Sequence, residues 1–217
     1  MTGTYSIYNG MWRGPSGPKT DSEGKVIKPD TRVVHDDVLM LPQYLKKAGY
    51  ATGIFGKWHL GYDADNVPNT RGFDDFVGFP GGAHPYTWNR NSKIQRNGQP
   101  LKSDKHYTDL FADEAIRFIQ ENQDRPFFCY LPFNAVHGPL RTESRDADSA
   151  RPDWLKIYEE AGVDQPRRDY NAVMSHADDR AGDVLEMLDE LKLAENPLVI
   201  FLSDNGGISH TSPSNNG

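Results

Sequence analysis

The sequence lacks the features that mark a membrane-spanning, disulfide-stabilised or nucleic-acid-binding protein. A single cysteine, Cys129, excludes an internal disulfide. No apolar run approaches the roughly 18 residues of a membrane-spanning helix, and the N-terminal residues show no basic region followed by an apolar one, as in a signal peptide. There are 24 basic residues against 31 acidic ones, a net charge of −7, so we expect neither a membrane span nor a nucleic-acid-binding surface.

What the sequence does contain is typical of a folded, water-soluble domain. Of its 217 residues, 36% are hydrophobic and 25% are charged, enough to build one sizeable core. Both ends, MTGTYSIYNG and GGISHTSPSNNG, have the composition of loops that normally connect two elements. We therefore expect residues 1–217 to be a single, incomplete domain of a longer protein.

Hydrophobic periodicity predicts three helices and three strands in alternation. The helices cover residues 38–48, 106–122 and about 168–192, where apolar side chains recur three and four positions apart. The strands are the runs YATGIF (50–55), PFFCYLPF (126–133) and PLVIFL (197–202). Irregular loops are expected over 10–32, 62–105 and 141–167, with a small hairpin around RNGQ at 96–99.

This alternation of helices and strands predicts the fold class. It indicates an α/β protein with a mostly parallel sheet flanked by helices on both faces, because parallel strands need helical crossover connections. In open parallel sheets, ligands bind beyond the carboxyl ends of the strands. The residues that follow each predicted strand are therefore the first candidates for a functional site.

Polar side chains of complementary chemistry follow all three predicted strands. They are Lys57 and His59 after the first strand, Asn134 and His137 after the second, and Asp204 and Asn205 after the third. Lys57 and His59 lie two residues apart and would share one face of an extended chain. Together these side chains predict an anion-binding site with a metal ion beside it.

The metal would be a hard cation such as Ca²⁺ or Mg²⁺. The carboxylate of Asp204 and the amide oxygen of Asn205 suit such an ion, and Gly206 and Gly207 let the chain turn sharply beside it. Two oxygen donors are fewer than the six to eight that Ca²⁺ takes, so other ligands must come from elsewhere.

Each cluster also has a structural interpretation. The SDNGG segment alone is typical of a turn, His137 of a hydrogen-bonded loop histidine, and Lys57 of a solvated lysine. Cys129, in the middle of a predicted strand, is expected to be a buried structural thiol rather than a nucleophile. His84, in GGAHPYTW, is a weaker candidate for a residue that lines the pocket.

At these residues the chain resembles the type I sulfatases, which are sulfuric ester hydrolases of the alkaline-phosphatase-like superfamily. GYATGIFGKWHLG is similar to the second signature of that family, VHGP to its histidine-x-proline segment, and IFLSDNGG to its metal-binding segment. RGFDDFVGF and the helix YTDLFADEAIRFI also agree in spacing, and the resemblance runs from Thr2 to Gly217.

The resemblance implies a role for each candidate residue. Lys57 would bind the sulfate oxygens, His59 would hydrogen-bond the nucleophile, and His137 would contact the sulfate and protonate the leaving oxygen. Asp204 and Asn205 would ligate a divalent cation, usually Ca²⁺.

Parts of the family's site have no counterpart in this chain. Thr2-Gly3 resembles the tail of the first signature, with Thr4 where arginine is usual. The formylglycine nucleophile of that signature would therefore precede Met1. The paired aspartates of a first strand and a lysine expected beyond Gly217 are absent as well. We therefore expect this chain by itself to be an inactive part of a sulfatase catalytic domain.

The expected substrate is a sulfated small molecule or a sulfated glycan. Two alternatives stay open: a phosphate- or phosphonate-ester hydrolase of the same superfamily, and a non-catalytic protein that only binds sulfated glycans. Many relatives are exported, which implies a periplasmic, secreted or lysosomal location for the whole protein. The sequence of this chain fixes neither the location nor the oligomeric state.

Overall fold

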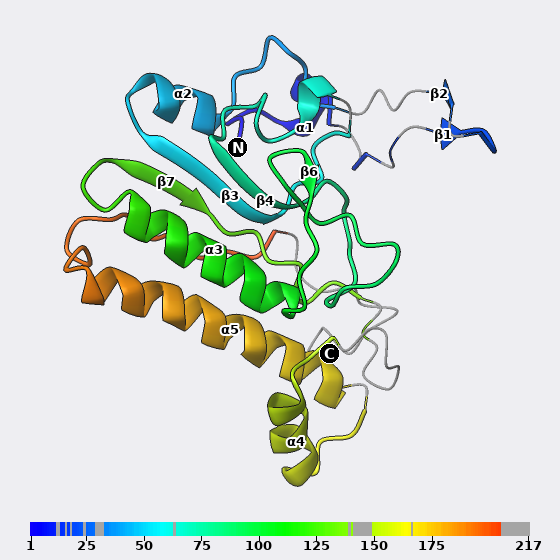
Figure 1. Ribbon diagram of the computed structural model, residues 1–217, viewed down its shortest axis with the longest axis vertical. Helices are drawn as coiled ribbons and strands as arrows, with labels where there is room; N and C mark the ends of the chain where they lie inside the picture. The colour runs from blue at the N-terminus through cyan, green and yellow to red at the C-terminus, as the bar shows by residue number, and fades with distance from the viewer. Residues whose placement is uncertain are drawn as a thin grey trace.

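The centre of the molecule is a five-stranded mixed sheet with the order β6-β5-β4-β3-β7 (Figure 1). The computed structural model describes residues 1–204 except 12, 13, 16, 18, 24, 29–32, 63, 139, 141–148 and 166. The strands are β3 (Ala51–Lys57), β4 (Asp75–Phe79), β7 (Phe127–Tyr130), β5 (Gln95–Arg96) and β6 (Gln99–Pro100). β3 pairs in parallel with both β4 and β7, so the carboxyl ends of these three strands lie at one edge.

Helices cover both faces of this sheet. α2 (Leu41–Lys47) lies on one face, and α3 (Tyr107–Glu121) lies on the other (Figure 1). α5 (Arg167–Glu190) packs on the outer side of α3, and α4 (Pro152–Glu160) packs against α5. The short helices are α1 (Ser6–Asn9) and a 3₁₀ turn (Ala64–Asn66), and β1 (Lys19–Thr20) and β2 (Val26–Lys28) form a separate antiparallel ribbon. No helix of the described residues is long and apolar enough to cross a membrane.

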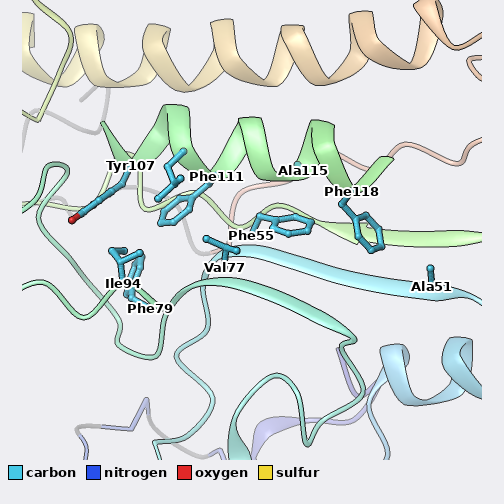
Figure 2. Packing of buried hydrophobic residues seen from close by; sticks show 10 residues of the cluster. Ala51, Phe55, Val77, Phe79, Ile94, Tyr107, Phe111, Ala115 and Phe118 are labelled. Carbon is cyan, nitrogen blue, oxygen red and sulfur yellow. The ribbon is translucent and has the colours of Figure 1, made fainter. Parts of the chain in front are cut away.

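Strand periodicity explains why the core has two halves. Successive side chains of a strand point to opposite faces, so Phe55 of β3 and Val77 of β4 pack under α3, while Ile54 and Phe76 face α2. Figure 2 shows the half under α3, where Phe55, Phe111 and Phe118 meet. Burial of each such ring stabilises the fold by about 2–3 kcal/mol.

The α/β prediction is confirmed, and so are the predicted helices. Those at 38–48, 106–122 and 168–192 correspond to α2, α3 and α5. The runs at 50–55 and 126–133 form β3 and β7, and the RNGQ hairpin is the β5–β6 turn. In that turn Asn97 and Gly98 both have positive φ, as a type I′ turn requires.

The prediction that residues 197–202 form the third strand is wrong in the described structure. This segment has no strand pairing, and the side chains of Leu198 and Phe201 are 86% and 82% exposed. An apolar sequence forms a strand only beside a partner, and no described strand pairs with this segment.

All three predicted loops contain regular elements, and the β1–β2 ribbon lies within 10–32. β4 lies within 62–105 and takes the place of the third parallel strand beside β3. Its sequence, DFVGF, lies among turn residues, so the pattern predicted a loop there and not a strand. α4 lies within 141–167 and begins at Pro152, a residue that suits the first turn of a helix.

Candidate functional site

Lys57 is the last residue of β3 and lies at the carboxyl edge of the sheet. Its backbone N–H donates to the carbonyl of Pro132, 2.9 Å away in the chain that follows β7. Its side chain is 19% exposed, and Nζ lies 3.6 Å from Oδ2 of Asp204, whose side chain is 71% exposed. The ion pair between Lys57 and Asp204 therefore brings the first and third predicted clusters together at this edge of the sheet.

His59 is held from both sides in an unusual backbone conformation. Its φ is 54°, in the left-handed region, and its N–H donates to the carbonyl of Pro80 at 3.1 Å. The ring Nε2 lies 3.1 Å from the carbonyl of Pro15. Because a carbonyl can only accept, Nε2 carries the proton and the neutral ring has its lone pair on Nδ1.

The surroundings of His59 keep its ring neutral. Burial lowers the pKa of His59 first; the positive charges of Lys57 and His137 lower it further, against opposing effects of the Pro15 hydrogen bond and of Asp204. Lys57, His137 and Asp204 therefore all lie close enough to His59 to affect its pKa. A histidine that is neutral at neutral pH can accept a hydrogen bond from a hydroxyl group.

His137 lies in the loop that follows β7, with its side chain exposed. Its backbone N–H donates to the carbonyl of Asn134 at 2.9 Å, and its Nδ1 lies 2.7 Å from the carbonyl of Gly138. Asn134 is buried, and its Nδ2 donates to the carbonyl of His84 at 2.7 Å. Asn134 thus fixes the loop, while the His137 imidazole remains accessible from solvent.

Asp204 is the last residue before a stretch that the structure does not describe. Its charge raises the pKa of Tyr130, after the larger effect of burial, which places the carboxylate near the end of β7. The other predicted metal ligand, Asn205, and the two glycines after it lie outside the described residues. Lys57, His59, His137 and Asp204 are therefore the predicted residues that the structure brings together.

In the segment Pro80–Tyr86, which follows β4 at the same edge, sequence analysis singled out only His84, as a weaker candidate, and missed the contacts that the segment makes to the site. A Cβ on Gly82 would lie 2.4 Å from Cε1 of His59, so a side chain there would push this ring out of its place. The hydroxyl of Tyr86 donates to the carbonyl of His137 at 3.1 Å. Had DFVGF been identified as a strand, GGAHPY would have been a fourth polar cluster at a strand end.

Trp58 and Cys129 are structural. Trp58 is 5% exposed, and its Nε1 donates to the carbonyl of Asn66 at 2.7 Å. Cys129 is half-buried in β7 against the core, and burial raises its pKa to about 12, which disfavours the reactive thiolate.

A second group of ligand-type side chains lies between α3 and α5. The nitrogen and oxygen atoms of His106, Asp109 and His176 lie within 4.8 Å of one another, so this group could hold a metal ion. Two histidines and one carboxylate suit zinc better than Ca²⁺, which prefers oxygen ligands. These side chains are already bonded, however: Nε2 of His176 to Asp109 at 2.8 Å and Nδ1 of His106 to the N–H of Thr108 at 3.2 Å.

His106 makes the stability of the fold depend on pH. Burial, followed by the charge of nearby His176, lowers the pKa of His106 to about 4, against the opposing effect of Asp109. In the unfolded chain the pKa returns to about 6.5, so between pH 6.5 and 4 only the unfolded state binds this proton. The free energy of unfolding should therefore fall as pH falls across this window, by up to about 3 kcal/mol.

Urea unfolding at pH 7 and pH 4.5 measures this dependence. The variant His106→Gln should lose most of it, whereas His35→Gln, at an exposed site, should keep it. An unchanged dependence in His106→Gln would show that another group carries it.

The fold and this edge of the sheet define an α/β protein in which one ammonium group, two imidazoles and a carboxylate gather at the carboxyl ends of the parallel strands. The chain belongs to the sulfatase family, whose family model matches residues 1–216. The resemblance to type I sulfatases of the alkaline-phosphatase-like superfamily is thereby confirmed.

Curated relatives and solved structures agree with this assignment. The chain is 30% identical over 200 residues to N-acetylgalactosamine-6-sulfatase of Homo sapiens, covering 85% of this chain and 35% of that protein. It is 29% identical over 221 residues to arylsulfatase J of Mus musculus, covering 95% of this chain and 34% of that protein. The chain thus spans about a third of the length of these relatives.

The crystal structure of Ps i-CgsB is similar in fold, with a TM-score of 0.66 and 28% identity over 76% of this chain and 39% of that one. A second structure of the same protein, with the same values, is in complex with k-i-k-neocarrahexaose.

Proposed function

We propose that the whole protein hydrolyses sulfate esters and that Lys57, His59 and His137 act in this reaction. The observation that carries the proposal is the meeting of these three residues with Asp204 at one edge of the sheet, in a chain of the sulfatase family. Positive and hydrogen-bonding groups aimed at one point stabilise the negative charge that develops when a sulfate ester is cleaved.

Each side chain is suited to one task. Lys57 is partly shielded from water, so its charge would bind sulfate oxygens more strongly than a solvated lysine does. His59 has its Nε2 bonded to Pro15, which leaves Nδ1 to accept a hydrogen bond from the nucleophile. His137 is exposed to solvent and would give a proton to the leaving oxygen as a general acid. The resemblance places the nucleophile, a formylglycine, outside this chain.

We also propose that Asp204 and Asn205 are ligands of a divalent cation, Ca²⁺, as the resemblance implies. The exposed carboxylate of Asp204 beside Lys57 fits one hard oxygen ligand. When bound, the cation would supply positive charge to the sulfate oxygens. The described residues provide only this one ligand, so the site as a whole needs further donors.

The proposed substrate class is sulfated sugars. The name of one relative, N-acetylgalactosamine-6-sulfatase, refers to a sulfated sugar. The structural neighbour Ps i-CgsB has been crystallised in complex with k-i-k-neocarrahexaose. Export of the whole protein, which the resemblance implies, stays a prediction.

Turnover of matched esters by the full-length protein tests the proposal. With 4-nitrophenyl sulfate and 4-nitrophenyl phosphate, we expect kcat/KM for the sulfate to be larger by about tenfold or more, because the site would be complementary to the sulfate ester in its transition state. EDTA should abolish turnover, and added Ca²⁺ should restore it.

Other outcomes would support the alternatives. Faster turnover of the phosphate, restored by a transition metal and not by Ca²⁺, would indicate a phosphate-ester hydrolase. Saturable binding of a sulfated oligosaccharide without turnover would indicate a non-catalytic binding protein. Either outcome would overturn the proposed function.

A further inference from the structure

The segment Pro80–Tyr86 connects the two histidine-bearing loops of the candidate site. At its start, the carbonyl of Pro80 accepts from the N–H of His59, and Gly82 packs directly on the His59 ring. At its end, the carbonyl of His84 accepts from Asn134, and Tyr86 bonds to the loop of His137. One rigidly held segment therefore determines how far apart the two histidines lie.

His137 depends on this segment because its own contacts are local. The imidazole Nδ1 bonds to the carbonyl of the next residue, Gly138, and the backbone N–H to Asn134, three residues earlier. Neither contact fixes the loop relative to Lys57 or His59. Among the described residues, the hydrogen bonds that reach Asn134 and His137 from outside the loop come from the segment Pro80–Tyr86, whereas Lys57 bonds only to Pro132, at the start of the loop.

Tyr86 makes the external contact that reaches His137 itself. Its side chain is 3% exposed, and its hydroxyl donates to the carbonyl of His137 at 3.1 Å and approaches that of Asn134 at 3.4 Å. Ala135 and Val136 of the same loop pack against the hydrophobic cluster to which Tyr86 belongs. A hydroxyl buried among carbonyls has no water to replace these bonds, so its loss leaves acceptors without a partner.

The ring of Tyr86 is itself held in place by another ring, that of His106. It stacks on His106, with ring centroids 5.5 Å apart and an angle of 27° between the planes. His106 in turn lies 4.5 Å from His176, which bonds to Asp109 of α3. A continuous chain of contacts thus runs from the α3–α5 interface to the carbonyl of His137.

We propose that Tyr86 is a positioning residue, which holds the His137 loop at the distance from Lys57 and His59 that catalysis requires. The inference rests on the proposed function and deepens it, since it names what aligns the general acid. Tyr86 touches no substrate in this account, because it is buried behind the loop. Its effect is expected on kcat, since a small misplacement of a catalytic group costs rate more than binding.

The test compares two tyrosine-to-phenylalanine variants of the full-length protein. In Tyr86→Phe the ring and its stacking on His106 remain, and only the hydroxyl is lost. We expect kcat for 4-nitrophenyl sulfate to fall about tenfold, with KM changed less than about twofold. The amide hydrogen of His137 should also exchange with solvent faster, because the loop is less restrained.

Tyr107→Phe is the matched control. Tyr107 is 1% exposed, and its hydroxyl lies 2.9 Å from that of Ser92, away from His137. Both variants should lose a similar, small amount of thermal stability, about 2–4 °C. Only Tyr86→Phe should change kcat and the exchange of the His137 amide.

Two results would overturn the inference. The first is a kcat in Tyr86→Phe equal to that of Tyr107→Phe, and the second is unchanged exchange at His137. If the wild-type protein turns over no sulfate ester, the proposed function fails, whereas exchange at His137 still decides whether Tyr86 holds the loop.

Discussion

Lys57→Gln is expected to lower kcat/KM for a sulfate ester by about 10²–10³-fold, the loss seen when one donor to a developing negative charge is removed. Glutamine keeps a hydrogen-bond-donating NH₂ group on a somewhat shorter side chain but removes the positive charge. That charge acts from the end of β3, where the side chain is 19% exposed and water screens it weakly. The same change should weaken binding of inorganic sulfate as a competitive inhibitor.

Lys46→Gln is the control for this prediction. Lys46 lies in the last turn of α2 and pairs with Asp74, just before β4 begins, at the opposite edge of the sheet. Its charge is far from the site and is screened by solvent, so kcat/KM should stay within about twofold of wild type. If Lys57→Gln were as active as Lys46→Gln, Lys57 would be a structural partner of Asp204 and not a sulfate ligand.

Gly56→Ala is expected to cost about 3 kcal/mol of the free energy of unfolding, more than any surface change of similar size. Gly56 has a φ of 137°, which strains any residue with a side chain. A Cβ there would also lie 2.1 Å from the backbone oxygen of Pro132, which cannot move aside easily. The same Pro132 oxygen accepts from Lys57, so the change should displace Lys57 as well.

Gly49→Ala separates the two causes. Gly49 also has a positive φ, 88°, but a Cβ there would meet nothing within 4 Å. Its replacement should cost about 1 kcal/mol, which is backbone strain alone. Urea unfolding of both variants measures the difference. Equal losses would show that the chain at Pro132 can shift to accommodate a side chain at Gly56.

The helices were predictable because their signals are local. Apolar side chains three and four residues apart define α3 and α5 without knowledge of any partner. β3 was also predictable, since a strand buried on both faces is a continuous apolar run bounded by glycine. The same reasoning failed at α4, whose short amphipathic sequence lies between long polar stretches.

Strand pairing was not predictable, because a strand exists only with its neighbours. DFVGF is short and contains glycine, yet it forms β4 because β3 lies beside it and α3 covers it. PLVIFL is the more apolar run, yet its residues are exposed and form no strand in the described structure. In both segments, the intrinsic strand preference of the residues mattered less than the presence or absence of a partner strand.

The sequence by itself determined the α/β class and the residue types of the site, because Lys57, His59, His137 and Asp204 each follow an apolar run at its carboxyl end. Only the tertiary structure decided that β4 lies beside β3, which brings Gly82 and Tyr86 against the two histidine-bearing loops. The physical reason is that the chemical groups of a site are its side chains, and the sequence gives their identities directly. Distances between side chains depend on contacts between segments far apart in the chain.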